Sequence, residues 1–385
     1  MDESLTEEML AWRESLRRFV DREIAPVARE YEQNGVYPTE ILEQLKAMGL
    51  FGVTVPEEYG GLSTGAVGLA IMFEEIARGW MSVAGALGSH TLACFMIAKH
   101  GTDEQKKRLL PDLATGARRT ALALTEPGAG SDLQGIATRA VQDGGDYVLN
   151  GTKMWITNAR HADPLPVLAR TGVNMRGAHE LSLFLVDAGS PGLEVSKDLG
   201  KMGYRGIETC EVVLTDVRVP ARNLLAGEEG HGLSQVLSAL EIGRINVAAR
   251  SLGIAQSAYE KALAYAQQRE AFDQPIANFQ AVQIKLAKMA TDIQAARLLT
   301  LWGAASIDRG VRSDVESGMA KMFASEVAVA SSLESMRIHG AAGYSTEYEI
   351  ERLYRDAPLM VIGEGTNDIL AMVIARGLLK RTRSR

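Results

Sequence analysis

The hydrophobic pattern divides the chain into three parts, and the first part has the helical period. Ser4 and Glu7 are spaced as a capping box, and apolar residues then follow mainly on one helical face as far as Ile24. Four more stretches with helical character occur at about 39–48, 65–78, 82–99 and 103–114. The first part is therefore predicted to be an all-helical unit.

In the second part, the period changes from helical to β. Short runs rich in β-branched and aromatic residues occur at 147–149, 154–157, 181–186 and 209–214. Within this part, Asp143-Gly144-Gly145-Asp146 is a hairpin-type turn sequence. Closely spaced strands without long helices between them predict an antiparallel sheet, barrel or sandwich rather than a doubly wound parallel sheet.

The helical period returns from about Gly232 and persists to the end of the chain. Long alanine-rich stretches occur at 240–269, 279–309, 315–339 and 367–379. Apolar residues on more than one face of such helices are typical of a bundle or of subunit contacts. The predicted fold is mainly α with a central β-domain. Its three domains are expected at 1–118, 119–226 and 227–385.

Composition and charge narrow the classes of function. Of the 385 residues, 46% are hydrophobic and 23% are charged, and the net charge of −7 disfavours nucleic-acid binding. Cys94 and Cys210 are too few for a disulfide scaffold, and the acidic first ten residues lack the basic start of a secretory signal. The stretch 82–98 carries no charge but is interrupted by glycines, so it predicts a core helix and no membrane span. A cytoplasmic protein is expected.

Three motif-like patterns do not predict a function here. The sequence Gly61-Leu62-Ser63-Thr64-Gly65 has the G-x-S-x-G form, but no buried strand precedes it, as a serine hydrolase requires. The sequence Gly128-Ala129-Gly130 begins like a dinucleotide fingerprint, but no βαβ unit surrounds it. The six histidines show no metal-ligand spacing, so no metal site is predicted.

Two neighbouring stretches have chemistry suited to a flavin. Residues 123–135 combine glycines with hydroxyl side chains and free backbone N–H groups, which suit a phosphate or a carbonyl-rich ring. Some 20 residues later, Trp155 and Thr157 lie on the same face of a predicted strand. An isoalloxazine ring could stack on Trp155 and hydrogen-bond to Thr157.

Near the C-terminus, one carboxylate stands between two glycines, in Gly363-Glu364-Gly365. The glycines would let a ligand lie against the backbone on both sides of Glu364, and residues 366–368 can cap the helix that follows. Taken alone, a carboxylate at such a junction is more often a solvated acid or a helix cap than a catalytic group.

Six ordered motifs, taken together, resemble the acyl-CoA dehydrogenase family. They are A-L-T-E-P-G-A-G-S-D-L-Q-G at 123–135, M-W-I-T-N at 154–158, R-E-A-F at 269–272, F-Q-A at 279–281, H-G-A-A-G-Y at 339–344 with L-Y-R-D at 353–356, and G-E-G-T-N at 363–367. The resemblance covers nearly the whole chain. It implies a helical N-terminal domain, a central β-domain and a C-terminal four-helix bundle, with FAD as the cofactor.

The resemblance also assigns binding residues position by position. The FAD contacts that it implies within one chain are Leu122, Leu124, Thr125, Gly130, Ser131, Trp155, Ile156, Thr157, Thr366, Asn367 and Asp368. A second group would reach FAD bound to a neighbouring subunit, which implies a homotetramer: Arg269, Phe272, Gln280, Arg337, Gly340 and Ala341. The implied acyl-CoA contacts are Ser131, Glu241, Arg244 and Gly365.

The activity implied by the resemblance is α,β-dehydrogenation of an acyl-CoA thioester to a trans-2-enoyl-CoA, as in fatty acid metabolism. Glu364 would abstract the α-proton, and flavin N5 would accept the β-hydride. An electron-transferring flavoprotein would then reoxidise the flavin. Gly243 occupies the place where a minority of the family carries the catalytic acid, so Glu364 is the one base candidate at a known family position.

Two departures from the family pattern leave alternatives open. Arg337 replaces a frequent glutamine and Ala341 a usual glycine, both near the adenine half of FAD, which keeps a flavin-binding subunit of a mixed oligomer possible. A flavin oxidase or monooxygenase on the same fold is a second alternative, although the retained base argues against it. For the acyl group, Val83 and Leu87 would offer apolar lining and no cation, which disfavours a dicarboxylic substrate.

Overall fold

The computed structural model describes residues 5–175 and 177–383, and the predicted capping residue Ser4 lies outside this part. Within it, Thr6 caps the first helix, because its Oγ1 accepts a hydrogen bond from the backbone N–H of Met9 at 3.2 Å. The N-terminal helices are α1 (Glu7–Phe19), α2 (Ala28–Gln33), α3 (Thr39–Ala47), α4 (Gly65–Gly79), α5 (Met81–His100) and α6 (Asp103–Ala114). The last three match the predicted ranges to within a residue or two.

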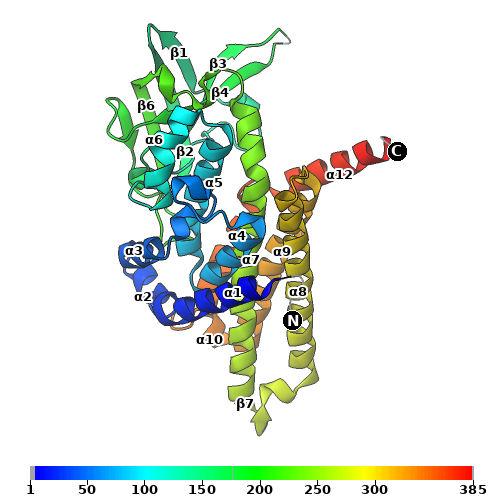
Figure 1. The fold of residues 1–385 in the computed structure, drawn as a ribbon. Coiled ribbons are helices and arrows are strands. Elements are labelled where there is room, and N and C mark those ends of the chain that lie inside the picture. Colours follow the sequence, from blue (N-terminus) through cyan, green and yellow to red (C-terminus); the bar gives the residue numbers. More distant parts are fainter. Residues whose placement is uncertain (1–4, 176, 384–385) are drawn as a thin grey trace.

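A curled six-stranded sheet forms the middle of the chain and lies at one end of the molecule (Figure 1). Its strands are β1 (Arg139–Asp143), β2 (Asp146–Thr157), β3 (Leu165–Val173), β4 (His179–Val186), β5 (Leu193–Val195) and β6 (Thr209–Pro220). They are arranged in the order β4-β3-β1-β2-β6-β5. All neighbouring pairs are antiparallel except β1 and β3, which pair in parallel at Arg139 and Arg170. The sheet is therefore antiparallel, as predicted, apart from this one parallel pair.

The strand β2 joins two runs that the sequence pattern separates. It stays continuous because β-bulges at Leu149/Gly151 and Lys153/Ile156 absorb the breaks in alternation while it pairs with β6. The predicted turn at 143–146 does connect β1 to β2. The strand β3 was not predicted, because Pro164 and Pro166 flank its start and proline is unusual in a strand interior.

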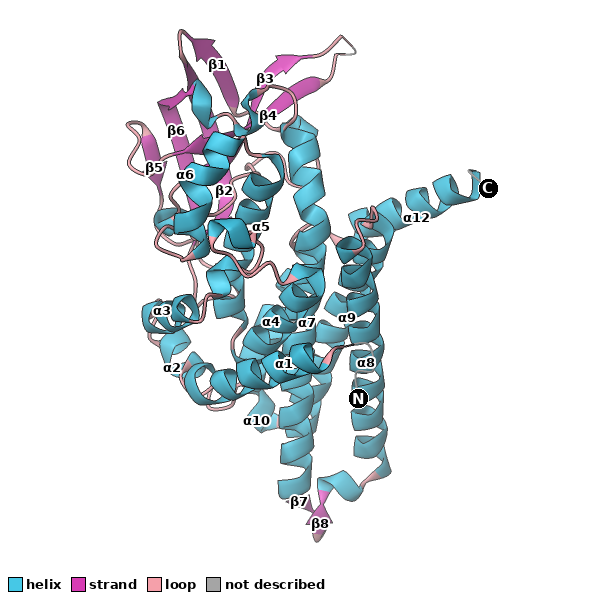
Figure 2. Cartoon of the chain, in the orientation of Figure 1, coloured by secondary structure: helices cyan, strands magenta, loops and turns pink. Residues whose placement is uncertain are grey.

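Long helices make up the rest of the chain and run along one another as a bundle (Figure 2). They are α7 (Gly232–Gln268), α8 (Gln280–Asp308), α9 (Asp314–His339), α10 (Ala341–Tyr344), α11 (Ile350–Ile362) and α12 (Asn367–Arg383), with a small hairpin of β7 (Glu270–Ala271) and β8 (Gln274–Pro275) between α7 and α8. Small residues allow close helix packing. A Cβ added at Gly253 of α7 would lie 2.4 Å from the carbonyl oxygen of Glu74 on α4.

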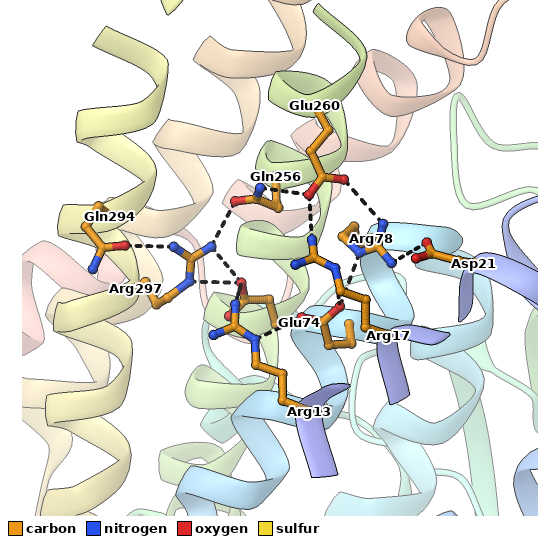
Figure 3. Close-up of polar contacts among 10 residues, drawn as sticks. Arg13, Arg17, Asp21, Glu74, Arg78, Gln256, Glu260, Gln294 and Arg297 are labelled. Carbon is orange, nitrogen blue, oxygen red and sulfur yellow. Dashed lines mark hydrogen bonds and ion pairs between the residues drawn. The ribbon is translucent and has the colours of Figure 1, made fainter. Parts of the chain in front are cut away.

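A network of ion pairs ties the N-terminal helices to the bundle (Figure 3). At its centre, Arg297 of α8 donates to Glu74 Oε1 from Nη2 at 2.7 Å and from Nε at 3.0 Å. The same guanidinium donates to Gln256 of α7 at 2.9 Å. Nearby, Glu260 of α7 accepts from Arg17 of α1 at 2.5 Å. Helices α1, α4, α7 and α8 are therefore joined by charged groups as well as by the apolar core.

The apolar helix α5 is part of this core. Among the described residues, Met81–His100 is the one single helix long and apolar enough to cross a membrane, and 83% of its most apolar window is buried inside the protein. The prediction of a core helix over 82–98 is confirmed. This helix packs against α7, and the candidate site lies along their contact.

Candidate active site

The predicted base, Glu364, lies in the short loop between α11 and α12. Its backbone has φ = +58° and that of Gly365 has φ = +92°, so two successive residues are left-handed and the loop turns sharply. The buried Lys321 of α9 donates from Nζ to the carbonyl oxygens of Val361 and Gly365 at 3.0 and 2.8 Å. Lys321 therefore fixes the loop on both sides of the carboxylate.

The carboxylate of Glu364 faces α7 at Gly243. A Cβ added at Gly243 would lie 2.2 Å from Glu364 Oε2 and 3.0 Å from a methyl carbon of Leu92 on α5. Oε2 is buried and has no hydrogen-bond partner among the described residues. Burial raises the pKa of Glu364, and the positive charges of Arg250, Lys321 and Arg244 oppose the rise. The site thus holds a desolvated carboxylate with a free oxygen.

The glycine-rich stretch 123–135 lies beside the strand that carries Trp155. The backbone N–H of Met154 donates to the carbonyl oxygen of Thr125 at 2.8 Å. A buried ion pair anchors the loop, since Lys153 Nζ lies 2.8 Å from Glu126 Oε1 and also donates to the carbonyl oxygen of Leu124 at 3.1 Å. The two stretches that the sequence analysis assigned to a flavin are therefore adjacent.

Trp155 lies at the bulge of β2 and is turned outward by a left-handed backbone, with φ = +63°. Its side chain is 57% exposed, whereas that of Ile156 is 2% exposed and belongs to the core of the β-domain. Thr157 is half-buried, and its side chain interacts with the buried Tyr204. The bulge thus exposes Trp155 and leaves Ile156 as structural support.

These residues fit a flavin. An indole with more than half of its surface exposed offers a flat apolar face, and a Cβ added at Gly128 or Gly130 would meet no atom of the described residues within 4 Å, apart from the adjoining residues of the chain. The loop therefore presents open backbone next to the aromatic side chain. Ser131 is also exposed on this loop, and Leu122, Leu124 and Thr125 line its half-buried start.

Glu241 and Arg244, the predicted acyl-CoA contacts on α7, form polar contacts with residues at the start of α9. Glu241 Oε2 accepts from the backbone N–H and the hydroxyl of Ser313, both at 3.1 Å. Arg244, which is 5% exposed, pairs with Asp314 at 3.4 Å, and its Nε has no partner among the described residues. Arg244 thus lies close to Glu364 and keeps a donor free for a ligand.

The side chains of residues 366–368, which follow Glu364, differ in what they contact. Thr366 Oγ1 accepts from the backbone N–H of Ile369 at 3.4 Å, and Asp368 is exposed. The side chain of Asn367 is engaged with α9, since Nδ2 donates to Glu326 at 2.8 Å and Oδ1 accepts from Lys321 at 2.9 Å. Asn367 therefore positions the loop, and its FAD contact stays a prediction.

The second predicted FAD group lies elsewhere, around the β7–β8 hairpin and the end of α9. In Figure 1 the hairpin is at the opposite end of the molecule from the sheet. The members of this group are all exposed: Arg269, Phe272, Gln280, Arg337, Gly340 and Ala341. Arg337 forms an ion pair with Glu334. Within one chain, these residues are not brought together with Trp155 and Glu364.

Four residues around Glu364 and Gly243 were missed by the sequence analysis: Tyr204, Asn246, Arg250 and Lys321. Each is buried, and Tyr204 and Arg250 are close enough to interact with each other. None belongs to a recognisable motif. The available signal was helical spacing, because Asn246 and Arg250 follow Gly243 by three and seven residues on one face of α7.

The site combines a desolvated carboxylate on the bundle with an exposed indole beside a glycine-rich loop of the β-domain. This combination is typical of a flavin-dependent oxidoreductase of acyl thioesters. Three family models match this chain: acyl-CoA dehydrogenase N-terminal domain over 6–117, middle domain over 121–217 and C-terminal domain over 230–379. The chain belongs to the acyl-CoA dehydrogenase family, and FAD is its cofactor. The predicted fold, enzyme class and cofactor are confirmed.

Individual relatives are similar over their full length. A probable acyl-CoA dehydrogenase, YngJ, from Bacillus subtilis is 43% identical, with 99% of this chain and 100% of the relative covered. The structure of butyryl-CoA dehydrogenase from Megasphaera elsdenii has a TM-score of 0.94 at 36% identity, covering 98% and 100% of the two chains. A glutaryl-CoA dehydrogenase from Mycobacterium smegmatis in complex with FADH2 has a TM-score of 0.92 at 32% identity, covering 98% and 96%.

A metal centre finds no support in the described part of the chain. No group of three or more His, Cys, Asp or Glu side chains there is arranged to hold a metal ion.

Proposed function

We propose that this enzyme oxidises the α,β-bond of an acyl-CoA thioester to give a trans-2-enoyl-CoA, with Glu364 as the base that takes the α-proton. The observation that carries the proposal is the buried Oε2 atom of Glu364, which has no partner among the described residues and faces the side-chain-free surface of Gly243. A free, desolvated carboxylate oxygen is what proton abstraction from a weak carbon acid requires.

The surroundings of Glu364 set its strength as a base. Burial raises its pKa and so increases its affinity for a proton, while Arg250, Lys321 and Arg244 keep the ionised form accessible. Gly363 and Gly365 carry no side chains, so the backbone on both sides of Glu364 is open to a ligand. The backbone N–H of Glu364 is thereby available to donate to the thioester oxygen, where negative charge develops as the proton leaves.

The residues that would hold FAD are those of the open loop and the bulged strand. Gly130, Ser131 and Thr125 would contact it from the loop, and Trp155 and Thr157 from β2. Bound FAD would supply the acceptor for the Cβ hydride, and an electron-transferring flavoprotein would take up the electrons. Ser131, Glu241, Arg244 and Gly365 would orient the CoA thioester so that its α-carbon lies at Glu364.

We also infer a homotetramer, because the second FAD group is exposed and far from Trp155 in the same chain. A second copy could bring Arg269, Gln280 and Arg337 to its neighbour's FAD. Large apolar side chains along the bundle offer an interface of the kind that oligomers bury: Ile284, Leu298 and Trp302 on α8, Phe323 on α9, and Met372, Leu378 and Leu379 on α12. Light scattering of the purified enzyme should give four chains, and a monomer that retains FAD would contradict this inference.

The proposal is tested by following the flavin colour. The purified enzyme should be yellow, and an acyl-CoA added without oxygen should bleach it. Glu364→Gln should keep bound FAD and the yellow colour but lose bleaching, because an amide of the same shape cannot take the proton. Fast bleaching of the Glu364→Gln enzyme would remove Glu364 from its proposed role.

Two other functions give different results in the same assay. If the chain were only a flavin-binding subunit of a mixed oligomer, the homotetramer alone would not bleach with any acyl-CoA. If it were an oxidase or a monooxygenase, the substrate-reduced enzyme would regain its colour rapidly in air. A dehydrogenase should instead be reoxidised slowly by air and rapidly by an electron-transferring flavoprotein.

A further inference from the structure

The contact between α5 and α7 continues beyond Glu364 as a line of facing residues. Gly243, Asn246 and Arg250 lie on one face of α7, so Asn246 and Arg250 are about 4.5 and 10.5 Å further along the helix than Gly243. On the α5 side, a Cβ added at Gly88 would lie 3.3 Å from Asn246 Nδ2 and 3.7 Å from Arg250 Cζ. Because Gly243 and Gly88 carry no side chains, Glu364 lies directly against α7, and Asn246 and Arg250 of α7 lie directly against α5.

The far part of this line is polar. Asn246 is fully buried, and neither Nδ2 nor Oδ1 has a hydrogen-bond partner among the described residues. The side chain of Arg250 is 7% exposed, and its Nε also lacks a partner in this part of the chain. Buried polar groups are normally hydrogen-bonded, and an unpaired one costs about 1–3 kcal/mol. Two neighbouring side chains with free buried atoms therefore point to a ligand.

A third polar group, the phenol of Tyr204, comes from the loop between β5 and β6. A Cβ added at Gly85 of α5 would overlap its Oη at 1.8 Å, and the hydroxyl interacts with Thr157 and Arg250. Its backbone is held in place, because the N–H of Tyr204 donates to the buried Asp356 Oδ1 at 2.6 Å. The phenol is therefore a fixed group, one helical turn beyond Gly88.

Arg250 differs from the other cations near Glu364 in its contacts with oxygen atoms of the protein. Arg244 pairs with Asp314 at 3.4 Å, and Lys321 donates to three oxygens at 2.8–3.0 Å. Among the described residues, no carboxylate forms a direct ion pair with Arg250, and Glu364 acts on it only through longer-range attraction, by which Arg250 lowers the pKa of Glu364. A buried guanidinium without an ion-pair partner is costly, and a second carboxylate in the site would neutralise it.

We propose that Arg250, Asn246 and Tyr204 form a subsite for a carboxylate at the far end of the acyl group, so that the substrate is the CoA thioester of a short dicarboxylic acid. This inference rests on the proposed dehydrogenase function. A carboxylate accepts hydrogen bonds only, and the three side chains offer guanidinium, amide and phenol donors to it. Because this subsite lies within two helical turns of Gly243, the acyl chain of the substrate must be short.

The sequence analysis disfavoured such a substrate because Val83 and Leu87 on α5 supply no cation. The cation comes instead from α7, on the opposite wall. Sequence spacing alone did not show that Arg250 faces Gly88, since α7 is apolar on several sides.

The test compares CoA thioesters matched in chain length. Succinyl-, glutaryl- and adipyl-CoA are paired with butyryl-, pentanoyl- and hexanoyl-CoA, and kcat/KM is measured with the FAD-loaded enzyme. We expect the best dicarboxylic thioester to exceed its monocarboxylic match by about 100-fold, the size expected for charge-assisted hydrogen bonds. A ratio near one for every pair would overturn the subsite while leaving the dehydrogenase intact. Failure of all six substrates to bleach the flavin would instead overturn the proposed function.

Variants separate recognition from packing. Arg250→Met should lower the ratio to near one, and Arg250→Lys should restore at least a tenth of it, because the charge returns. Tyr204→Phe and Asn246→Leu should each lower the ratio by about 10-fold. If Arg250→Met slowed both members of a pair equally, Arg250 would serve only as a counter-ion of Glu364, and the proposal would fail.

Binding gives an independent readout that needs no turnover. Titration calorimetry on the Glu364→Gln enzyme should give a Kd at least 10-fold lower for glutaryl-CoA than for pentanoyl-CoA. The difference should disappear in Glu364→Gln/Arg250→Met. Equal Kd values in Glu364→Gln would contradict the proposal even if Arg250→Met failed to fold.

Discussion

Glu364 lies against Gly243 so closely that a Cβ at position 243 would come within 2.2 Å of the carboxylate oxygen Oε2. No heavy atom of a side chain can occupy that position unless the carboxylate moves. The two residues are 121 positions apart, on different elements of the bundle, and the absence of a side chain on α7 is what admits the base from the loop after α11. The identity of residue 243 is therefore a condition for the position of Glu364.

The substitution Gly243→Ala tests this condition. The added methyl should displace the carboxylate and lower kcat for flavin reduction by about 100-fold, since a misplacement of about 1 Å can cost that much. The FAD content should stay unchanged, because Gly243 is not among the residues expected to hold FAD. Gly145→Ala is the matched control, as a Cβ there would meet no atom of the described residues within 4 Å besides those of its chain neighbours. Full activity in Gly243→Ala would show that the carboxylate does not need its observed position.

Lys321 supports the same loop from the opposite side. Lys321→Met removes the donor to Val361, Gly365 and Asn367 and also removes a positive charge that lowers the pKa of Glu364. The pKa of the base should therefore rise, and the acidic limb of the kcat profile should move to higher pH. Stopped-flow flavin reduction from pH 5.5 to 9 measures this shift.

The exposed Lys288, paired with Asp292, provides the control for charge removal. Lys288→Met should leave the pH profile in place. A Lys321→Met enzyme whose acidic limb stayed fixed or moved to lower pH would contradict the assigned influence of Lys321 on Glu364.

The sequence predicted those parts of the site that lie in contiguous stretches. The loop at 123–135, the strand with Trp155 and the glycine-flanked Glu364 each carry their own local pattern, and the structure places the first two side by side through Thr125 and Met154. The three-part division into helices, sheet and bundle was readable for the same reason, because hydrophobic period is a local property.

Residues brought together only by packing could not be predicted in this way. Asn246 and Arg250 lie on a helix that is apolar on several faces, so the pattern does not show which side meets α5. Tyr204 reaches the site from a loop because Asp356, over 150 positions away, holds its backbone. The parallel pairing of β1 with β3 likewise joins residues more than 30 positions apart, Arg139 and Arg170.

The buried His90 should make the fold sensitive to acid. Its Nε2–H donates to the carbonyl oxygen of Phe51 at 3.2 Å, and Nδ1 accepts from the N–H of Thr120 at 3.2 Å, so the ring is held neutral. Burial lowers the pKa of His90 to about 4. The unfolded chain, with a pKa near 6.5, therefore binds the proton first, and stability falls as the pH drops from 6.5 to 4.

The expected loss through His90 is about 3 kcal/mol at pH 4, because each pKa unit corresponds to about 1.4 kcal/mol. Urea unfolding at fixed protein concentration should show this loss in the native protein. His90→Gln, which retains a donor toward Phe51 but does not titrate, should lose less over the same range. Parallel pH curves for the two proteins would argue against a neutral buried His90.

The ion pair between Arg297 and Glu74 offers a test of what joins the N-terminal helices to the bundle (Figure 3). Both side chains are about nine-tenths buried. Arg297→Met leaves Glu74 without its main partner in a dry environment, which should lower the free energy of unfolding by about 3–5 kcal/mol.

The double variant Glu74→Leu/Arg297→Met removes both charges and should be less destabilised than the sum of the two single variants. Arg218→Gln, at an exposed pair with Asp143, should cost below about 1 kcal/mol. Additive effects in the double variant would show that Arg297 and Glu74 act independently, through packing rather than through their shared charge.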